Sequence, residues 1–192
     1  MGGSSFAQTR NKIGNTAPTI KDAAFFKNAF DTIQELILEG QILAGHDIGS
    51  GGLITTLLEM CFADVNLGAT ISFDTFNEKD LVKILFSENI GIVLQAKDDT
   101  SFEMALDGIE YFKIGKVTTE KFLSINNSQF NIDHYRDVWF KTSFLLDQKQ
   151  SKNNKAQERF DNYKNQALQF TFPTHFTGRL IGVTSSDSDA NQ

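Results

Sequence analysis

Ala44 to Cys61 reads AGHDIGSGGLITTLLEMC, and the predicted fold is organised around this stretch. Residues 42–44 are apolar, as expected at the end of a buried strand. From Leu53 to Phe62, apolar residues recur three and four positions apart, which is the spacing of a helix. Between them lies the turn Gly49 to Gly52, preceded by Asp47. The sequence therefore predicts a strand that enters a helix through a glycine-rich turn with an acid at its start.

A strand–turn–helix of this kind favours anion binding. The first backbone N–H groups of a helix have no partner within the helix and attract anions, and glycines let a phosphate approach closely. Asp47 is suited to hold a Mg²⁺ ion that the same phosphates share. The turn lacks the Lys-Ser/Thr ending of a P-loop and the spacing of a dinucleotide fingerprint, and turn geometry alone would also explain its glycines. These residues define a candidate anion site and leave its ligand open.

The composition indicates a globular chain with an acidic balance. Its 192 residues are enough for one domain with tails, and 40% of them are hydrophobic. The formal net charge is −6. No basic block exceeds two residues, which argues against non-specific nucleic-acid binding. No run of about 20 apolar residues and no signal peptide is recognisable, so no membrane association is expected. Cys61 is the single cysteine, which excludes a disulfide framework and favours a reducing cytoplasm.

Helical and strand patterns alternate along the chain, which predicts an α+β fold with a mixed β-sheet layered with helices. Helices are expected at Asp22–Glu39, Gly52–Phe62, Glu78–Phe86, Ser101–Ile109 and Asp133–Gln148. Strands are expected at Ile42–His46, Gly68–Phe73, Gly91–Ala96 and Tyr111–Val117, with a hairpin of Phe122–Ile125 and Gln129–Ile132. Residues 152–166 are expected to be helical in part.

Caps and apolar faces follow from the same patterns. Asp22, Asn77 and Asp133 are the predicted N-caps, and Gly40 is the predicted end of the first long helix. The apolar face of that helix is expected to comprise Ala24, Phe25, Ala29, Phe30, Ile33, Leu36, Ile37 and Leu38. The last helix is expected to direct inward Tyr135, Val138, Trp139, Phe144 and Leu145.

Five further side chains have alternative interpretations. His46 is equally compatible with a strand-end residue that bonds the backbone and with a functional residue. Glu59 is either a second metal ligand or, more simply, part of an ion pair on its helix. Arg136 and Trp139 lie one turn apart, which favours a cation–π contact with a neighbouring element over phosphate binding by Arg136. Cys61 is expected to be a buried core residue rather than a nucleophile. The three histidines are far apart in sequence, so no zinc site is expected.

Four blocks of sequence, in order, also carry a family resemblance. They are GGSSFAQ at Gly2–Gln8, AGHDIGSGGLITTLLEMCFA at Ala44–Ala63, ILFSENIGIVLQ at Ile84–Gln95 and RDVWFKTSFLLDQKQ at Arg136–Gln150. Over residues 2–178 the chain resembles the large form of the phosphoribosylformylglycinamidine synthases, which are ATP- and glutamine-dependent enzymes of purine biosynthesis. The resemblance is to the C-terminal-type subdomain of the synthetase core, whose superfamily includes aminoimidazole ribonucleotide synthetase. It implies a three-layer α/β/α arrangement.

The resemblance also implies site residues. The family pattern at the turn is His-Asp-Ile-Ser-Asp-Gly-Gly, where this chain has HDIGSGG at 46–52. Asp47 matches the family's magnesium ligand, and the nucleotide-binding turn corresponds to Gly49, Gly51 and Gly52. Gly49 replaces the family's serine that contacts ATP, and Ser50 replaces its second aspartate. At Gly49 the resemblance therefore implies a contact to ATP from the backbone and none from a side chain. No catalytic residue is assigned.

The implied activity belongs to a larger protein. ATP would activate the formamide oxygen of formylglycinamide ribonucleotide, and ammonia from glutamine would then displace phosphate to give the amidine. Residues 1–150 would be the synthetase subdomain, 151–178 a linker towards a glutaminase domain absent from this chain, and 179–192 a disordered tail. The partners would be ATP, formylglycinamide ribonucleotide and the rest of the synthetase core. Alone, this fragment is expected to be inactive. The alternative is a non-catalytic regulatory or scaffold module with the same fold.

Overall fold

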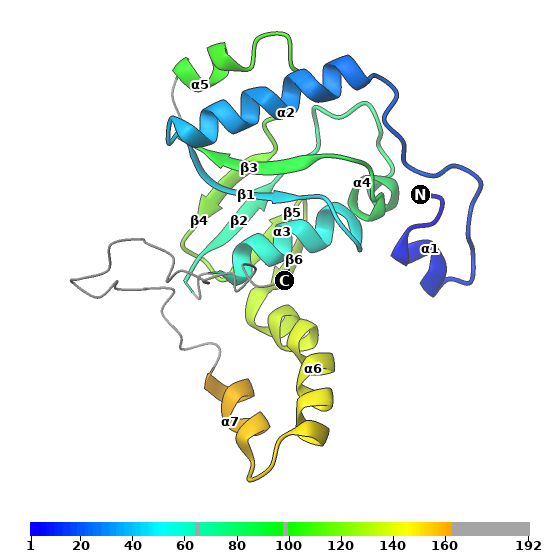
Figure 1. The fold of residues 1–192 in the computed structure, drawn as a ribbon, viewed down its shortest axis with the longest axis vertical. Helices are drawn as coiled ribbons and strands as arrows, with labels where there is room; N and C mark the ends of the chain where they lie inside the picture. Colours follow the sequence, from blue (N-terminus) through cyan, green and yellow to red (C-terminus); the bar gives the residue numbers. More distant parts are fainter. Residues whose placement is uncertain (64–65, 98–99, 163–192) are drawn as a thin grey trace, which may run out of the picture.

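The computed structural model describes residues 1–63, 66–97 and 100–162, and it has the predicted α+β fold (Figure 1). Its elements are α1 Ser5–Thr9, α2 Ala23–Leu38, β1 Ile42–Asp47, α3 Gly52–Phe62, β2 Gly68–Ile71, α4 Leu81–Phe86, β3 Ile92–Ala96, α5 Thr100–Ala105, β4 Gly115–Thr118, β5 Phe122–Ile125, β6 Ser128–Asn131, α6 Ile132–Gln150 and α7 Lys155–Asn162. The predicted disordered tail, residues 179–192, lies outside the described residues. Among the described residues, no helix is both long and apolar enough to span a bilayer.

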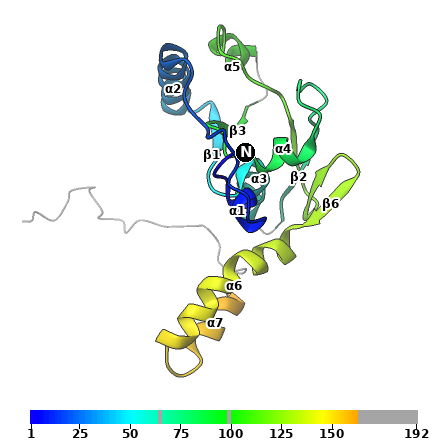
Figure 2. The ribbon, with the colours of Figure 1, turned by 90° about the vertical axis from the view of Figure 1, so that its right-hand side faces the viewer.

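The strands form two sheets, where the sequence predicts one mixed sheet. β1 and β3 pair antiparallel as a two-stranded ribbon, and the other four strands form a sheet in the order β4-β2-β5-β6. In that sheet β2 runs parallel to β5 and the other pairs are antiparallel, so the sheet is itself mixed. Figures 1 and 2 place the ribbon between α2 and α3. The period of a strand determines which of its faces is buried but not which strand it pairs with, so the division into two sheets is not readable from the sequence.

The central helix α3 has the predicted bounds and lies in the middle of the core. It joins the four-stranded sheet and α4 in a cluster of buried residues: Leu53, Ile54, Leu57, Ile71, Phe73, Leu85, Leu123 and Ile125. At the far end of α3, Cys61 and Phe62 pack with Ile132 at the start of α6. Cys61 is buried, as predicted. Because both ends of α3 are held in apolar clusters, the helix that follows the glycine turn has a fixed position in the core.

Two of the predicted helix starts are wrong, and side-chain hydrogen bonds explain both. The carboxylate of Glu78 accepts hydrogen bonds from the next two backbone N–H groups, so the chain turns there and α4 begins only after Asp80. Asp80, and not Asn77, caps α4 through the N–H groups of Val82 and Lys83. Asn131, and not Asp133, caps α6. The predicted cap at Asp22 is confirmed, because its Oδ1 accepts from the N–H of Phe25 at 2.9 Å.

The strand predictions are confirmed in type, but the observed bounds differ from the predicted ones except at Phe122–Ile125. The hairpin is formed by β5 and β6 across Asn126 and Asn127, with Ile125 opposite Ser128 and a positive φ of 51° at Asn126. Tyr111–Val117 is a strand only from Gly115, because β4 pairs with β2 over four residues of each strand. β2 ends at Ile71, since the next residues form a turn in which the N–H of Asp74 donates to Ser72 Oγ at 3.2 Å.

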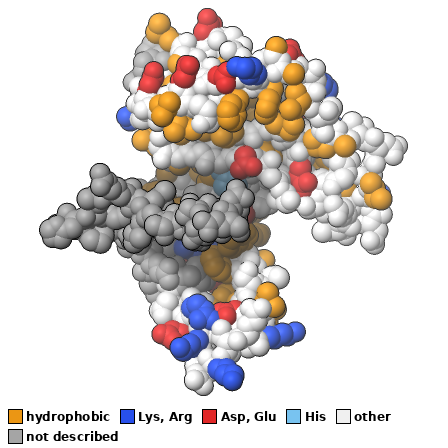
Figure 3. Space-filling view, in the orientation of Figure 1, with side chains coloured by type: hydrophobic (Ala, Val, Ile, Leu, Met, Phe, Trp, Pro, Cys, Tyr) orange, Lys and Arg blue, Asp and Glu red, His pale blue; other side chains and the backbone are white. Residues whose placement is uncertain are grey.

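The apolar face predicted for α2 is mostly exposed in the structure. Leu36 is the buried residue of α2, whereas Phe25, Phe30, Ile37 and Leu38 are exposed, Leu38 to 87%. Figure 3 shows hydrophobic side chains gathered over this helix. The period correctly identifies an amphipathic helix, but the described part of the chain leaves most of its apolar stripe in solvent.

The last helices project away from the core as a hairpin. Figure 2 shows α6 leaving the sheet and α7 folding back against it, and α6 contacts α3 near its start and α7 near its end. Val138 and Leu145 are exposed, so the prediction that they point inward is wrong. Trp139 is half-exposed, but its ring lies against Phe62 and its Nε1 donates to Glu59, so it does point toward α3. Among the residues that the structure describes, α7 is the main element that packs on α6 beyond its first turns, and one short helix covers little of its surface.

Candidate functional site

Asp47 is the last residue of β1, and its main chain is fixed on both sides. Its carbonyl oxygen accepts a hydrogen bond from Thr56 Oγ1 of α3 at 3.1 Å, and Thr56 is buried. The next N–H group, that of Ile48, donates to the carbonyl of Gly91 at 2.9 Å. The Asp47 side chain itself is 86% exposed. The strand end is therefore rigid while its carboxylate faces solvent at the mouth of the turn, which suits a ligand for a cation.

His46 and Glu59 lie beside Asp47 and bind each other. The Nδ1 atom of His46 lies 2.7 Å from the carbonyl oxygen of Asp47 and 3.5 Å from its Oδ1. The Nε2 atom of His46 lies 3.2 Å from Oε2 of Glu59, whose Oε1 accepts a hydrogen bond from Nε1 of Trp139 at 2.8 Å. Both ring nitrogens thus lie close to oxygen atoms that can accept a hydrogen bond. The partners of Glu59 thus lie on β1 and α6 and not on its own helix, and its contact with His46 is an ion pair only when the imidazole is protonated.

A metal site built entirely by the protein is not present in the part of the chain that the structure describes. No group of three or more His, Cys, Asp or Glu side chains there is arranged to hold a metal ion. Cys61 lies on the core side of α3, and burial raises the pKa of its thiol to about 11. The chemistry that the site offers is therefore that of an exposed carboxylate beside a glycine turn.

The turn has the left-handed backbone that its glycines permit. Gly51, the N-cap residue of α3, has φ 90° and Gly52 has φ 76°. A Cβ atom on Gly52 would lie 2.7 Å from the carbonyl oxygen of Leu85, so this position packs directly against the backbone of α4. A Cβ atom on Gly49 would meet nothing within 4 Å. The turn is consequently tight at Gly52 and open at Gly49.

Two of the backbone N–H groups predicted to face phosphate have acceptors within the protein. The N–H of Gly51 donates to Oε1 of Glu88 at 2.8 Å, and the N–H of Gly52 donates to the carbonyl of Gly49 at 3.1 Å. Sequence reasoning missed Glu88, which lies between α4 and β3, where no local pattern singles it out. Only tertiary folding brings this carboxylate to the turn 37 residues earlier in the chain.

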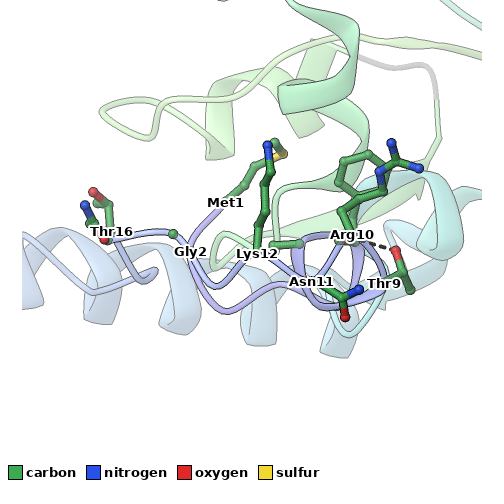
Figure 4. A pocket seen from close by; sticks show the side chains of 11 residues that line it. Met1, Gly2, Thr9, Arg10, Asn11, Lys12 and Thr16 are labelled. Atoms are coloured by element: carbon green, nitrogen blue, oxygen red, sulfur yellow. Dashed lines mark hydrogen bonds between the residues drawn. The ribbon is translucent and has the colours of Figure 1, made fainter.

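The N-terminal segment forms a closed loop next to this turn. The N–H of Gly2 donates to the carbonyl of Thr16 at 2.8 Å, and that of Gly3 donates to the carbonyl of Ile13 at 2.7 Å. The loop and α1 surround a hollow of about 680 Å³. Figure 4 shows the side chains of Arg10 and Lys12 on one side of it. The segment is thus an ordered part of the domain whose hollow carries two basic groups.

The arrangement agrees with comparisons to known proteins. Residues 1–126 match the family described as AIR synthase related protein, C-terminal domain. The chain is 36% identical over 160 residues to the Arabidopsis thaliana protein named "Probable phosphoribosylformylglycinamidine synthase, chloroplastic/mitochondrial", a match that covers 78% of this chain and 11% of that protein. It is 39% identical over 119 residues to the Dictyostelium discoideum phosphoribosylformylglycinamidine synthase, covering 59% of this chain and 9% of that protein.

The solved structure titled "Structure of PurLQS from Thermotoga maritima" is 22% identical, with a TM-score of 0.49, and the match covers 68% of this chain and 24% of that one. Because this similarity is weak, the assignment rests on the sequence matches. This chain spans about a tenth of the length of the two curated relatives, at 11% and 9%. On the match of residues 1–126, the chain belongs to the family of AIR synthase related C-terminal domains.

Proposed function

We propose that this chain is the C-terminal-type subdomain of a phosphoribosylformylglycinamidine synthase, in which Asp47 holds Mg²⁺ against the phosphates of ATP. The observation that carries the proposal is the exposed Asp47 carboxylate at the end of β1, beside a glycine turn, in a chain 36% identical to a relative of that name. The larger protein would be an ATP-dependent ligase that converts formylglycinamide ribonucleotide to the amidine with ammonia from glutamine. The fragment alone would be inactive.

The residues present fit a magnesium ion that protein and nucleotide share. Mg²⁺ is usually bound by one or two carboxylates, with water and substrate phosphates as its other ligands. Asp47 offers one exposed carboxylate, and its backbone is held by Thr56 and Gly91, so the ligand would be presented from a fixed position. When bound, the ion supplies charge neutralisation to the phosphates. The role of Asp47 is to hold it in place.

The glycine turn would face the same phosphates. Gly49, where an added Cβ would meet nothing, is the most open position for a phosphate to approach the backbone. Contacts to the N–H groups of Gly51 and Gly52 would require exchange with Glu88 and with the carbonyl of Gly49. The nucleotide contact is therefore assigned first to Gly49, and to Gly51 and Gly52 only after such an exchange.

The remaining assignments belong to the same proposal. Residues 1–150 would be the synthetase subdomain and 151–178 a linker towards a glutaminase domain, with α7 inside the linker. The rest of the synthetase core and that domain would be the partners of this chain, with the cytoplasm as its location. Neither nucleic acid nor membrane would be a partner, in keeping with the net charge of −6.

Nucleotide titration of the full-length protein at several Mg²⁺ concentrations tests the role of Asp47. Asp47→Asn keeps the shape of the side chain but removes its charge, so it should weaken magnesium-dependent nucleotide binding by about tenfold or more with little change in stability. Asp107→Asn, at an exposed acid after α5, is the matched control and should bind as the wild type does. Equal affinity and equal magnesium dependence in Asp47→Asn and wild type would reject the proposal.

A non-catalytic module with the same fold is the second candidate. It is favoured by Gly49 and Ser50 at positions where the family has serine and aspartate, and by the internal acceptors of the Gly51 and Gly52 N–H groups. Under this candidate, the wild-type protein itself would show no magnesium-dependent nucleotide binding at the Asp47 site. The same titration therefore distinguishes the two functions.

A further inference from the structure

Glu88 joins two segments that are far apart in sequence. Its Oε1 atom accepts hydrogen bonds from the N–H of Ser5, at the start of α1, and from the N–H of Gly51, each at 2.8 Å. Ser5 and Gly51 lie 83 and 37 residues from Glu88 along the chain. A single carboxylate oxygen therefore connects the N-terminal loop to the turn that follows β1.

Packing around Glu88 supports the same connection. The ring of Phe6 in α1 stacks on that of Phe86 at the end of α4, with centroids 4.5 Å apart. The backbone of α4 also fills the space beside Gly52, and the carbonyl of Gly91 accepts the N–H of Ile48. The segment that carries Glu88 thus touches α1 on one side and the glycine turn on the other.

The charge of Glu88 suits this role. Burial, the largest influence, raises the pKa of its carboxyl, but the hydrogen bonds from the N–H groups of Gly51 and Ser5 and from the Ser5 side chain together outweigh it and leave the pKa below its usual value. The side chain is therefore an anion at neutral pH, and hydrogen bonds to a charged acceptor are about twice as strong as those between neutral groups.

We propose that Glu88 is a positioning residue that holds residues 1–16 and the turn at 48–52 as one unit. It acts through the N–H groups of Ser5 and Gly51 and determines the position of the N-terminal loop relative to the end of β1, where Asp47 lies. Its effect on nucleotide binding rests on the proposed function, whereas the connection between the two segments does not. Loss of the carboxylate should loosen both segments together, although they are distant in sequence.

Hydrogen exchange in the full-length protein tests this connection, measured on the peptides that cover 1–16 and 48–53. Glu88→Ala should speed exchange at the N–H groups of Ser5 and Gly51 by about tenfold or more, the size expected for losing hydrogen bonds to a charged acceptor. Glu88→Gln keeps an oxygen acceptor without its charge and should give a smaller increase in both. Glu78→Ala is the control, because the described donors to this carboxylate, Lys79, Asp80 and Lys83, are all near it in sequence.

A second variant removes a hydrogen-bond donor to Glu88 and leaves the acceptor intact. Ser5→Pro deletes both the N–H and the hydroxyl of Ser5 at the first position of α1, where proline is accepted. Ser4 has the extended backbone that a following proline requires. It should speed exchange at Gly51 less than Glu88→Ala does, and it should add nothing at Gly51 in a Glu88→Ala background. Independent, additive effects at Gly51 would overturn the proposal. So would a Glu88→Ala variant in which one segment or neither changes, or a Glu78→Ala variant that changes both.

Nucleotide titration of Glu88→Gln then connects the inference to the site. The dissociation constant for nucleotide should rise about three- to tenfold, between the values for wild type and Glu88→Ala, as the looser turn presents the open backbone of Gly49 less well. Failure of the proposed function would appear as unchanged binding in Asp47→Asn, with the exchange results still standing. Failure of the present inference would appear in hydrogen exchange, whatever Asp47→Asn shows.

Discussion

Glu59 and Trp139 are hydrogen-bonded although they lie 80 residues apart: the indole Nε1 donates to the carboxylate Oε1 at 2.8 Å. The other oxygen of Glu59, Oε2, lies 3.2 Å from Nε2 of His46. One carboxylate on α3 thus connects the end of β1 to α6. This one side chain of α3 therefore connects α6 to the strand end that carries His46 and Asp47.

Trp139→Phe should reduce stability modestly. It removes the N–H donor but keeps an aromatic ring for the contacts that Trp139 makes with Phe62 and Phe140. Because both partners are partly exposed, water replaces the lost hydrogen bond in part, so the free energy of unfolding in urea should fall by about 1 kcal/mol. Val138→Ala, at an exposed neighbouring position, should have a smaller effect. Equal losses in the two variants would contradict a specific bond between Glu59 and Trp139.

Gly52→Ala should be strongly destabilising, and Gly49→Ala should be nearly neutral. At Gly52 a methyl group would lie 2.7 Å from the Leu85 carbonyl oxygen and 2.8 Å from the carbonyl carbon of Phe86, and the φ of 76° is unfavourable for alanine. Strain of this kind costs about 1–3 kcal/mol, and the backbone clash adds to it. Urea unfolding of both variants provides the comparison. A stable Gly52→Ala protein would mean that the turn does not pack on α4 in this way.

Cys61 should be unreactive in the native protein. Burial among Phe62 and Ile132 raises the pKa of its thiol to about 11, so little thiolate exists at neutral pH. Alkylation at pH 8 should be slow and should become fast only in denaturing urea. Because Cys61 is the single cysteine, total thiol labelling reports on it alone. Complete labelling of the folded protein within minutes would place the thiol in solvent.

The contact between α6 and α7 should persist in mildly acidic solution. A hydrogen bond from Arg159, helped by one from Ser151, lowers the pKa of Asp147 below its usual value. A lowered pKa in the folded state means that the contribution of this contact is fully present above the ordinary Asp value of about 3.9. It is lost as the pH falls through the lower, folded value. An NMR titration of the Asp147 carboxyl group should give a higher midpoint in Arg159→Gln than in wild type, and equal midpoints would refute the pairing.

The sequence by itself determined the local elements of this protein. The three-and-four spacing from Leu53 to Phe62 sets the bounds of α3, because the position of apolar residues on a helix depends only on its period. Asp22 caps α2 because a cap bonds a backbone group three residues away. The left-handed turn glycines likewise depend on their neighbours, and the period of α3 places Cys61 on its apolar face, so both features could be predicted.

Tertiary structure alone decided the partners. The sequence near Glu88 does not predict its hydrogen bonds with Ser5 and Gly51, and the sequence near Glu59 does not predict its hydrogen bond with Trp139. Such contacts depend on which elements the fold brings together. The same holds for the separation of β1 and β3 from the other strands and for the exposed stripe of α2. Periodicity predicts that a face is apolar, whereas the packing of the whole chain determines what covers that face and which side chain reaches a backbone N–H first.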